Sequence, residues 1–570
     1  MYLKGRKKTV RLLLCAASCL MLSGAAAMSA FADAAQETAQ TQEAVQNVIT
    51  TTGQISSCTI DTDKTNVTLN MTSNAEMAGT DGKIYLVEMK NWQDDLTGRT
   101  DYLASQDGAS QVSFHFPLNA DSTGDRRYSS FIAAVWDTEK QEYKALTPRY
   151  YITNPEIMAK DQSALRITGK KGLSIEFSLI EDAMNMGIKQ AEINIPVNFL
   201  YGNGVDYTYK GQTYHFAKSW LDTYDRVIKT LSGRGVVVTA VILNGWNAND
   251  PDMFLPGTTK SSDPYYMFNT KTEAGQRKLE AAANFLAERY NGSSGHGRLS
   301  NWVIGNEINN QYWNHTGAMD VRSYVELYQK AYRTFYAAVK SQNAHSNVLF
   351  SIDYYWNDSS KANGSTYYKG KDVLDQFNSV AAAEGPIDWG IAYHPYPYPM
   401  NDPVFWDDGS QGLTDSITTP ILNFYNLHVL TDYMQSSELR APDGNVRHIF
   451  LTEQGFTSTT PSGEKLKEQA AAYAYSYYLV ESNPYIEGYN LARQIDAPSE
   501  VKDGISFGLF YCDMNQPNNI VAYHSKPIYY VFKDIDVPSR TLSVSKEAKQ
   551  TLGISKWSEL IPHFKWSGLE

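Results

Sequence analysis

The sequence predicts an α/β protein, a (β/α)8 TIM barrel preceded by a small all-β sandwich domain. Three observations support this fold class. Short alternating runs separated by Gly, Asp and Asn fill residues 53–160. From about residue 165, strand-like and helical patterns alternate eight times. Runs such as "VVVTAVIL" are apolar throughout, which is typical of a parallel sheet covered on both faces.

The first 52 residues contain two segments that we expect to lie outside the folded domains. Residues 1–32 are interpreted as a signal peptide, because a basic start precedes the short apolar run "LLLCAASCLML" and the small residues "AFA". Residues 33–52 are rich in Gln, Ala and Thr and are interpreted as a linker. We therefore expect a secreted, extracellular protein, of a kind typical of bacteria.

The next region, 53–160, is predicted to form the β-sandwich domain. Its strand-like runs are "TNVTLNMT", "GKIYLVEM", "SQVSFHFPL" and "SSFIAAVWD". Such a domain could bind carbohydrate or brace its neighbour, and we favour bracing.

The barrel is predicted over 161–537, followed by a C-terminal appendage over 538–570. Each expected strand is a short apolar run, and each expected helix shows a helical period. The expected strands are 172–177, 191–197, 236–243, 301–304, 347–353, 388–394, 448–453 and 486–492. The expected helices are 179–186, 219–235, 272–290, 321–342, 371–383, 422–434, 466–483 and 526–535. An open doubly wound sheet is the alternative, but the glycine-rich turn typical of its first strand is absent.

Composition and motifs exclude several classes of function. A formal charge of -12 argues against a nucleic-acid partner, which would need clustered Lys and Arg. Neither a HExxH zinc motif nor a Gly-x-Ser-x-Gly esterase motif occurs, so no metal and no cofactor is predicted. No run after the signal is long enough to span a membrane. Cys58 and Cys512 could pair as one disulfide or remain two lone thiols.

Two glutamates at predicted strand ends are the candidates for chemistry. Glu307 follows the fourth strand in "IGNEIN", and Glu453 ends the seventh in "LTEQGF". In a barrel, catalytic groups lie where strands end and loops begin. Cleavage of a glycosidic bond needs an acid for the leaving oxygen and a carboxylate for the sugar cation, and retention needs a separation of about 5–5.5 Å. We therefore expect the two carboxyls to lie roughly 5 Å apart.

The motifs "IGNEIN", "HPY" and "LTEQGF" resemble those of clan A glycoside hydrolases, the retaining (β/α)8 superfamily that includes families 5 and 39. The resemblance covers roughly residues 165–535. It implies that Glu307 is the acid/base, that Glu453 is the nucleophile and that Asn306 binds the sugar 2-hydroxyl. It also implies that His394 and Tyr396 belong to the site, with the Tyr396 oxygen bonded to the nucleophile.

Three departures separate this chain from the pattern of the clan. Ile308 replaces a common Pro, Asn194 stands where strand two often carries Arg, and strand eight offers Asn490 and Arg493 instead of a Trp. Arg493 could bind an acidic substituent or pair with a structural carboxylate, and we favour the latter. The departures leave the two carboxylates intact. They put in doubt any assignment to this chain of the substrate of a particular known family.

Further substrate-binding candidates follow other strands. They are polar or aromatic residues that could line sugar subsites, namely Asn244, Trp246, Trp313 and Trp356.

The sequence thus predicts a secreted retaining glycoside hydrolase whose partner is a β-linked glycan. The alternative is a non-catalytic carbohydrate-binding or adhesion protein on a degenerate barrel. Because such a barrel would be expected to have lost at least one carboxylate, the complete set favours the enzyme.

Overall fold

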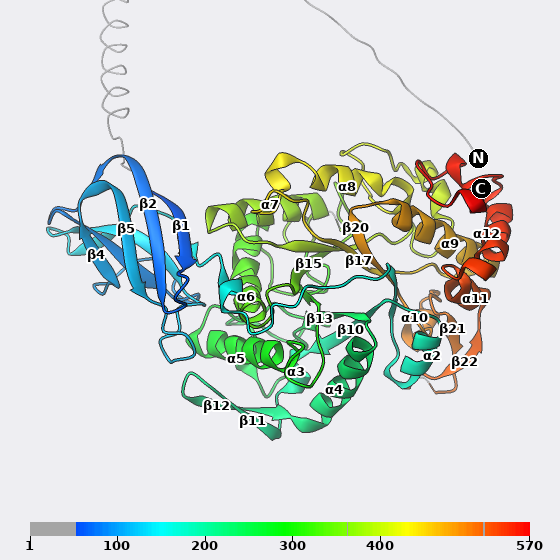
Figure 1. The fold of residues 1–570 in the computed structure, drawn as a ribbon, viewed down its shortest axis with the longest axis horizontal. Coiled ribbons are helices and arrows are strands. Elements are labelled where there is room, and N and C mark those ends of the chain that lie inside the picture. The colour runs from blue at the N-terminus through cyan, green and yellow to red at the C-terminus, as the bar shows by residue number, and fades with distance from the viewer. Residues whose placement is uncertain (1–52, 362, 517–518) are drawn as a thin grey trace, which may run out of the picture. The chain divides into compact units, whose positions relative to one another are not determined.

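The computed structural model describes residues 53–361, 363–516 and 519–570. The predicted signal peptide (1–32) and linker (33–52) lie outside these residues. The described chain forms a two-sheet β domain followed by a closed eight-stranded barrel (Figure 1). Within these ranges, no helix is both long and apolar enough to cross a membrane.

The β domain consists of two antiparallel sheets. One has the strand order β1-β2-β5 and the other β4-β3-β6-β7, with β8 paired to β6. Leu69 and Phe116 of the first sheet share a buried core with Leu86 and Phe131 of the second. The strands are β1 (Gln54–Ile60), β2 (Asn66–Met77), β3 (Lys83–Met89), β4 (Ala104–Asp107), β5 (Ala109–Pro117), β6 (Ser130–Asp137), β7 (Glu142–Ala145) and β8 (Tyr150–Tyr151).

Buried polar contacts join this domain to the barrel helices α5 (Glu273–Arg289) and α6 (Val321–Gln342). The Tyr128 hydroxyl donates to Asn284 Oδ1 at 2.7 Å, and Lys330 Nζ donates to the carbonyl of Asn91 at 2.8 Å. Such contacts fit the bracing role favoured from the sequence.

Eight parallel strands close the barrel in the order β10-β13-β14-β15-β16-β17-β20-β9. Closure depends on the short strand β9, which pairs with β10 on one side and with β20 on the other. The strands are β9 (Lys171–Ser174), β10 (Gln190–Pro196), β13 (Val237–Leu243), β14 (Asn301–Ile304), β15 (Asn347–Asp353), β16 (Gly390–His394), β17 (Ile449–Gln454) and β20 (Ile486–Leu491). The predicted fold class is confirmed.

Side chains alternate between the inside of the barrel and the surrounding helices. The apolar interior contains Val241, Val303, Leu349, Ala392 and Phe450, all buried. The surrounding helices are α2 (Ile180–Asn185), α4 (Lys218–Gly233), α5, α6, α7 (Gly370–Ala383), α8 (His428–Met434), α9 (Leu466–Ser482) and α11 (Pro527–Asp534). The predicted appendage, 538–570, contains α12 (Pro538–Leu552), which packs on α9 and α11.

One element was not predicted. The segment between the predicted strand 191–197 and the predicted helix 219–235 contains a hairpin of β11 (Gly204–Tyr209) and β12 (Gln212–Ala217). Lys210 and Gly211 form its turn with φ of 48° and 82°. Left-handed backbone at both central residues is what two-residue hairpin turns require. The loop is therefore an ordered insertion near the end of β10.

The two cysteines of the described chain, Cys58 and Cys512, are free and buried. Of the two alternatives left open by the sequence, the disulfide is wrong. Burial raises the pKa of the Cys58 thiol, so this residue acts as a packed apolar group of the β domain.

We expect Gly488→Ala to destabilise the barrel by about 1–3 kcal/mol, because it overpacks the interior. A Cβ at Gly488 would lie 2.1 Å from Gln190 Oε1 and 2.7 Å from a ring carbon of Phe450. The matched control is Gly233→Ala in α4, where a Cβ would meet no atom within 4 Å. Helix propensity predicts that this control is neutral or stabilised by up to about 1 kcal/mol. Urea unfolding measures the stability of both variants. Equal unfolding midpoints for the two variants would contradict the close packing around Gly488.

Candidate active site

Glu307 lies in a tight bend directly after β14. Gly305 has φ of +76°, and Glu307 itself has φ of +37°. A left-handed conformation in a residue other than Gly costs of the order of 1–3 kcal/mol and persists only where its surroundings impose it. Here the Glu307 N–H donates to Ser351 Oγ of β15 at 2.5 Å, and the Ile308 N–H donates to the Ser351 carbonyl at 2.9 Å. The neighbouring strand therefore fixes the direction of this carboxyl.

His394 connects the two strand ends that carry the glutamates. It ends β16 and is fully buried. Its Nδ1 lies 2.9 Å from Glu307 Oε1, and its Nε2 lies 3.0 Å from the hydroxyl of Thr452, the residue before Glu453. Both ring nitrogens are therefore occupied within the protein. The ring thus orients Glu307, and the predicted role of His394 in binding substrate stays a prediction.

Tyr396 holds the second carboxyl. Its hydroxyl donates to Glu453 Oε1 at 2.8 Å. Burial, and then the charge of Glu453, raise the pKa of Tyr396 far above its usual range, so the phenol keeps its proton. Glu453 is only partly buried at the end of β17. The structure thus brings Glu307, His394, Tyr396 and Glu453 into one hydrogen-bonded group, with the Tyr396 contact expected from the resemblance.

The two glutamates occupy different environments. Burial raises the pKa of Glu307, and repulsion by Glu453 adds to the increase. Hydrogen bonds from His394 and Trp313 offset part of this effect. Glu307 is therefore the buried carboxyl with a raised pKa, whereas Glu453 is partly exposed and accepts a bond from Tyr396. Such a division suits one acid and one carboxylate in the same site.

A polar network that was not predicted supports the loop that follows Glu307. Asn309 Nδ2 donates to Asp353 Oδ1 at 2.6 Å, and the Asp353 N–H donates to Asn309 Oδ1 at 3.0 Å. Burial, followed by the charge of Glu307, raises the pKa of Asp353 to about 7. Asp353 ends the apolar run "NVLFSID", so the strand-end criterion that identified Glu307 could have identified it as well.

A second cluster lies beside Glu453. Arg493, just after β20, pairs with Glu500 at 2.5 Å, which is the structural pairing that the sequence favoured. Asp496 pairs instead with buried Lys526 at 2.8 Å. Glu192 of β10 was missed: it is 3% exposed, and its Oε2 has no hydrogen-bond partner among the described residues.

The charge state of Glu192 follows from this burial. Burial and the neighbouring Glu453 raise the pKa of Glu192 well above its usual range, and Arg493 offsets part of the effect. The site thus holds a third carboxyl, whose burial favours its neutral form.

The other predicted ligands divide into two groups. Asn306 lies beside Glu307, and Trp313 hydrogen-bonds to Glu307 and lies 6.3 Å from the ring of Tyr265. Trp246 is partly buried after β13, with its ring 4.7 Å from that of Phe254. These three residues remain candidates for contact with a ligand.

Two predictions are wrong because loop packing buries the side chains. Trp356 is fully buried, and its indole N–H donates to the carbonyl of Ile417 at 3.1 Å. Asn244 is 1% exposed and donates to the carbonyl of Met253 at 2.9 Å. Both residues shape loops at the barrel mouth and are not available to a ligand.

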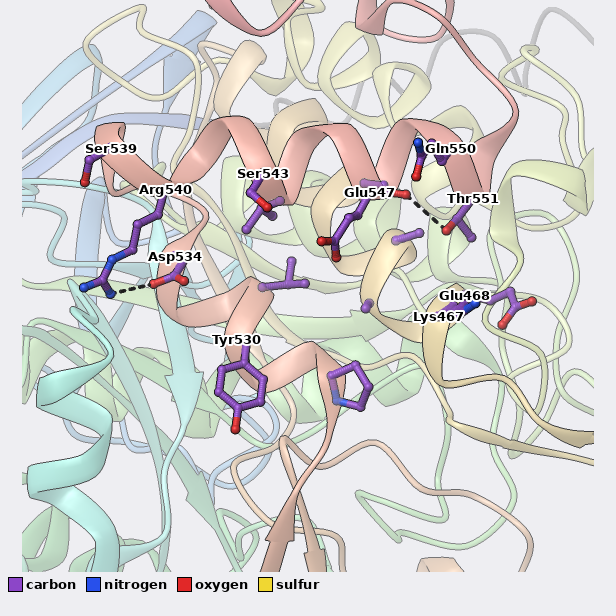
Figure 2. A pocket seen from close by; sticks show the side chains of 16 residues that line it. Lys467, Glu468, Tyr530, Asp534, Ser539, Arg540, Ser543, Glu547, Gln550 and Thr551 are labelled. Carbon is purple, nitrogen blue, oxygen red and sulfur yellow. Dashed lines mark hydrogen bonds and ion pairs between the residues drawn. The ribbon is translucent and has the colours of Figure 1, made fainter.

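A pocket of about 970 Å³ lies elsewhere, between α9, α11 and α12 (Figure 2). Tyr530, Asp534, Arg540 and Glu547 are among the residues around it, and none of its lining residues belongs to the strand-end group. The pocket therefore does not mark the glutamate pair. In the part of the chain that the structure describes, no group of three or more His, Cys, Asp or Glu is arranged to hold a metal ion.

Comparison with known proteins gives one family match and remote structural similarities. A family model described as "Family of unknown function (DUF5722)" matches residues 163–560. A search of curated proteins found no match. Among solved structures, a family 39 glycoside hydrolase from Bacteroides cellulosilyticus WH2 is 16% identical, with a TM-score of 0.42, 86% of this chain covered and 81% of that chain. A family 1 β-glucosidase from Thermotoga maritima is 14% identical, with a TM-score of 0.38, 63% of this chain covered and 85% of that one. Similarity this remote does not assign an activity.

We expect Asp353→Asn to flatten the dependence of stability on pH. The pKa of Asp353 is raised from 3.8 to about 7 in the folded protein, so its contribution is complete below about pH 4 and is lost as the pH rises towards 7. The amide keeps the Oδ1 acceptor but does not titrate. Urea unfolding measures the free energy of unfolding at pH 4.5 and at pH 7.5. Between these two pH values, the wild type should lose about 1–4 kcal/mol more of this free energy than Asp353→Asn does. If stability depends on pH as steeply in Asp353→Asn as in the wild type, the raised pKa of Asp353 is contradicted. The control is Asp372→Asn, at an exposed position of α7.

Proposed function

This chain belongs to the DUF5722 family of unknown function, and we propose that it is a retaining glycoside hydrolase that cleaves β-linked glycans. The observation that carries the proposal is the pair of glutamates at the ends of β14 and β17. They share one hydrogen-bonded group, yet one is buried with a raised pKa and the other is partly exposed. An acid and a carboxylate at one barrel mouth are the two groups that glycosidic cleavage requires.

In the first step, Glu307 donates its proton to the glycosidic oxygen as the bond to the anomeric carbon breaks. Glu453 attacks that carbon and forms a covalent glycosyl ester. The alcohol departs with the proton from Glu307, so Glu307 is left as a carboxylate. Tyr396 keeps the attacking carboxylate oriented through its bond to Oε1.

In the second step, the Glu307 carboxylate removes a proton from water, and the hydroxide attacks the anomeric carbon and releases Glu453. Two displacements at one carbon retain its configuration. The same group on Glu307 acts first as an acid and then as a base, which is why its pKa must lie near the working pH. Burial of Glu307 supplies this increase.

We also propose that the protein is exported and acts outside the cell. The basic and apolar start of the sequence supports this. A glycan substrate is compatible with such a location.

We expect Glu453→Gln to abolish turnover while the free energy of unfolding changes by less than about 1 kcal/mol. The amide oxygen can still accept the bond from Tyr396, but an amide cannot form the glycosyl ester. A panel of β-linked polysaccharides, with products separated by chromatography, measures the activity. The control is Glu547→Gln on exposed α12, which should retain full activity. Binding of glycan without turnover by the wild type would favour the non-catalytic alternative, and an inverted anomer in proton NMR would contradict the double displacement.

We expect Glu307→Gln to lose activity to an extent that depends on the leaving group of the substrate. With a natural glycan, kcat/KM should fall by roughly 10²–10⁴-fold, the usual contribution of a general acid. With a dinitrophenyl glycoside, whose leaving group needs no proton, bond cleavage should be affected much less. Because Glu307 acts while protonated, wild-type activity falls as the pH rises above its raised pKa, and the variant should lose this alkaline limb. Equal losses on both substrates would contradict the assignment.

A further inference from the structure

Two aromatic side chains stand exposed at the rim of the barrel mouth. Phe199 and Trp220 are 48% and 42% exposed, and their rings stack with centroids 5.2 Å apart and an interplanar angle of 9°. Trp220 is the most exposed tryptophan of the described chain. A single exposed apolar side chain is ordinary, but two large rings stacked in water leave a broad apolar face open to solvent.

The position of this stack follows from β10. Helix α3 (Val197–Leu200) continues β10 at its carboxyl end, and it packs beside the start of α4 (Figure 1). Asn198 of α3 accepts a bond from the Gly245 N–H, just after β13, at 3.0 Å. The Tyr224 hydroxyl of α4 donates to the carbonyl of Asn194 at 2.9 Å. Phe199 and Trp220 therefore lie at the same end of the barrel as the strand-end group.

Successive residues lead along β10 from the glutamates to the stack. Glu192, beside Glu453, is buried inside the barrel. Asn194, two residues on, has the same side-chain direction but is exposed, so the interior opens to solvent there. Phe199 follows five residues later, at most about 18 Å along the chain. A ligand chain that enters at Glu453 can continue past Asn194 onto the stack.

The chemistry of the stack fits a sugar ring. Aromatic faces are negative and prefer the positive edges of C–H groups, which the face of a pyranose presents. The neighbouring charges on α4, Lys218 and Asp222, pair with each other at 2.6 Å and leave no net charge. Such a surface matches a neutral pyranose better than an anionic one.

We propose that Phe199 and Trp220 form a distal subsite that stacks one neutral sugar unit of the glycan whose bond is cleaved between Glu307 and Glu453. This inference rests on the proposed function. The subsite makes the enzyme selective for glycan chains of several sugar units, because a short substrate cannot occupy both the glutamate pair and the stack at the same time.

The test compares Phe199→Ala, Trp220→Ala and the double variant on substrates of different length. The probes are a 4-nitrophenyl β-glycoside of one sugar unit and the soluble polysaccharide that the wild type cleaves best among hydroxyethyl cellulose, xylan, lichenan and galactomannan. We expect kcat/KM on the polysaccharide to fall at least tenfold while activity on the aryl glycoside stays within about twofold. Trp220→Phe should recover most of the loss. The matched control is Tyr530→Ala, which removes an aromatic ring that is 59% exposed on α11.

Glycan binding measured in a variant that lacks turnover distinguishes failure of the subsite from failure of the proposed function. In a Glu453→Gln background, affinity electrophoresis in the same four polysaccharides should show retardation that Trp220→Ala removes. Equal losses on short and long substrates would indicate a structural role and overturn the subsite, as would unchanged retardation and unchanged kcat/KM on polysaccharide. Retention of turnover in Glu453→Gln would instead overturn the proposed function. Absence of retardation in all four glycans would overturn the subsite for neutral sugars.

Discussion

Closure of the parallel sheet is the constraint on which the rest of the molecule depends. Because all eight strands run in one direction, every carboxyl end lies on one rim, and residues distant in sequence meet there. The closure rests on β9, whose four residues join β10 to β20. Glycine at 172 and 488 makes room for the interior amides of Asn490 and Gln190. Without this closure, the ends of β14 and β17 would not share a site.

Within the closed rim, the His394 ring links the two strand ends that carry the glutamates. Its buried ring spans from Glu307 on one side to Thr452 on the other, so a displacement of either strand end breaks a buried hydrogen bond. Leaving a buried polar group unpaired costs about 1–3 kcal/mol. The strained bend at Glu307 is held in the same way by Ser351. The acid is thus positioned by two neighbouring strands, which accounts for its burial and therefore for its raised pKa.

The sequence predicted the parts of this site that depend on local pattern and on the direction of strands. Apolar runs identified all eight barrel strands, and the polar residues at their ends identified Glu307 and Glu453. It failed for Trp356 and Asn244, because their burial depends on how long loops fold over the mouth. It also missed the hairpin after β10, although "GVDYTYKGQTYHFA" alternates around a Lys-Gly turn. Glu192 was hidden for another reason: its alternation resembles that of a solvent-facing strand residue, and only closure places it inside.

Glu192 also bears on the electrostatic surroundings of Glu453. An ionised acid buried without a partner is costly, so this carboxyl is held neutral, as its raised pKa indicates. An ionised Glu192 would place a negative charge beside the carboxyl of Glu453. A neutral carboxyl carries no such charge, and its O–H is able to donate a hydrogen bond. Arg493, bound to Glu500, adds a positive charge to this cluster. The carboxyl of Glu453 thus accepts a bond from the neutral Tyr396 phenol and lies near the buried Glu192 carboxyl and the Arg493 guanidinium, whose own ion pair is with Glu500.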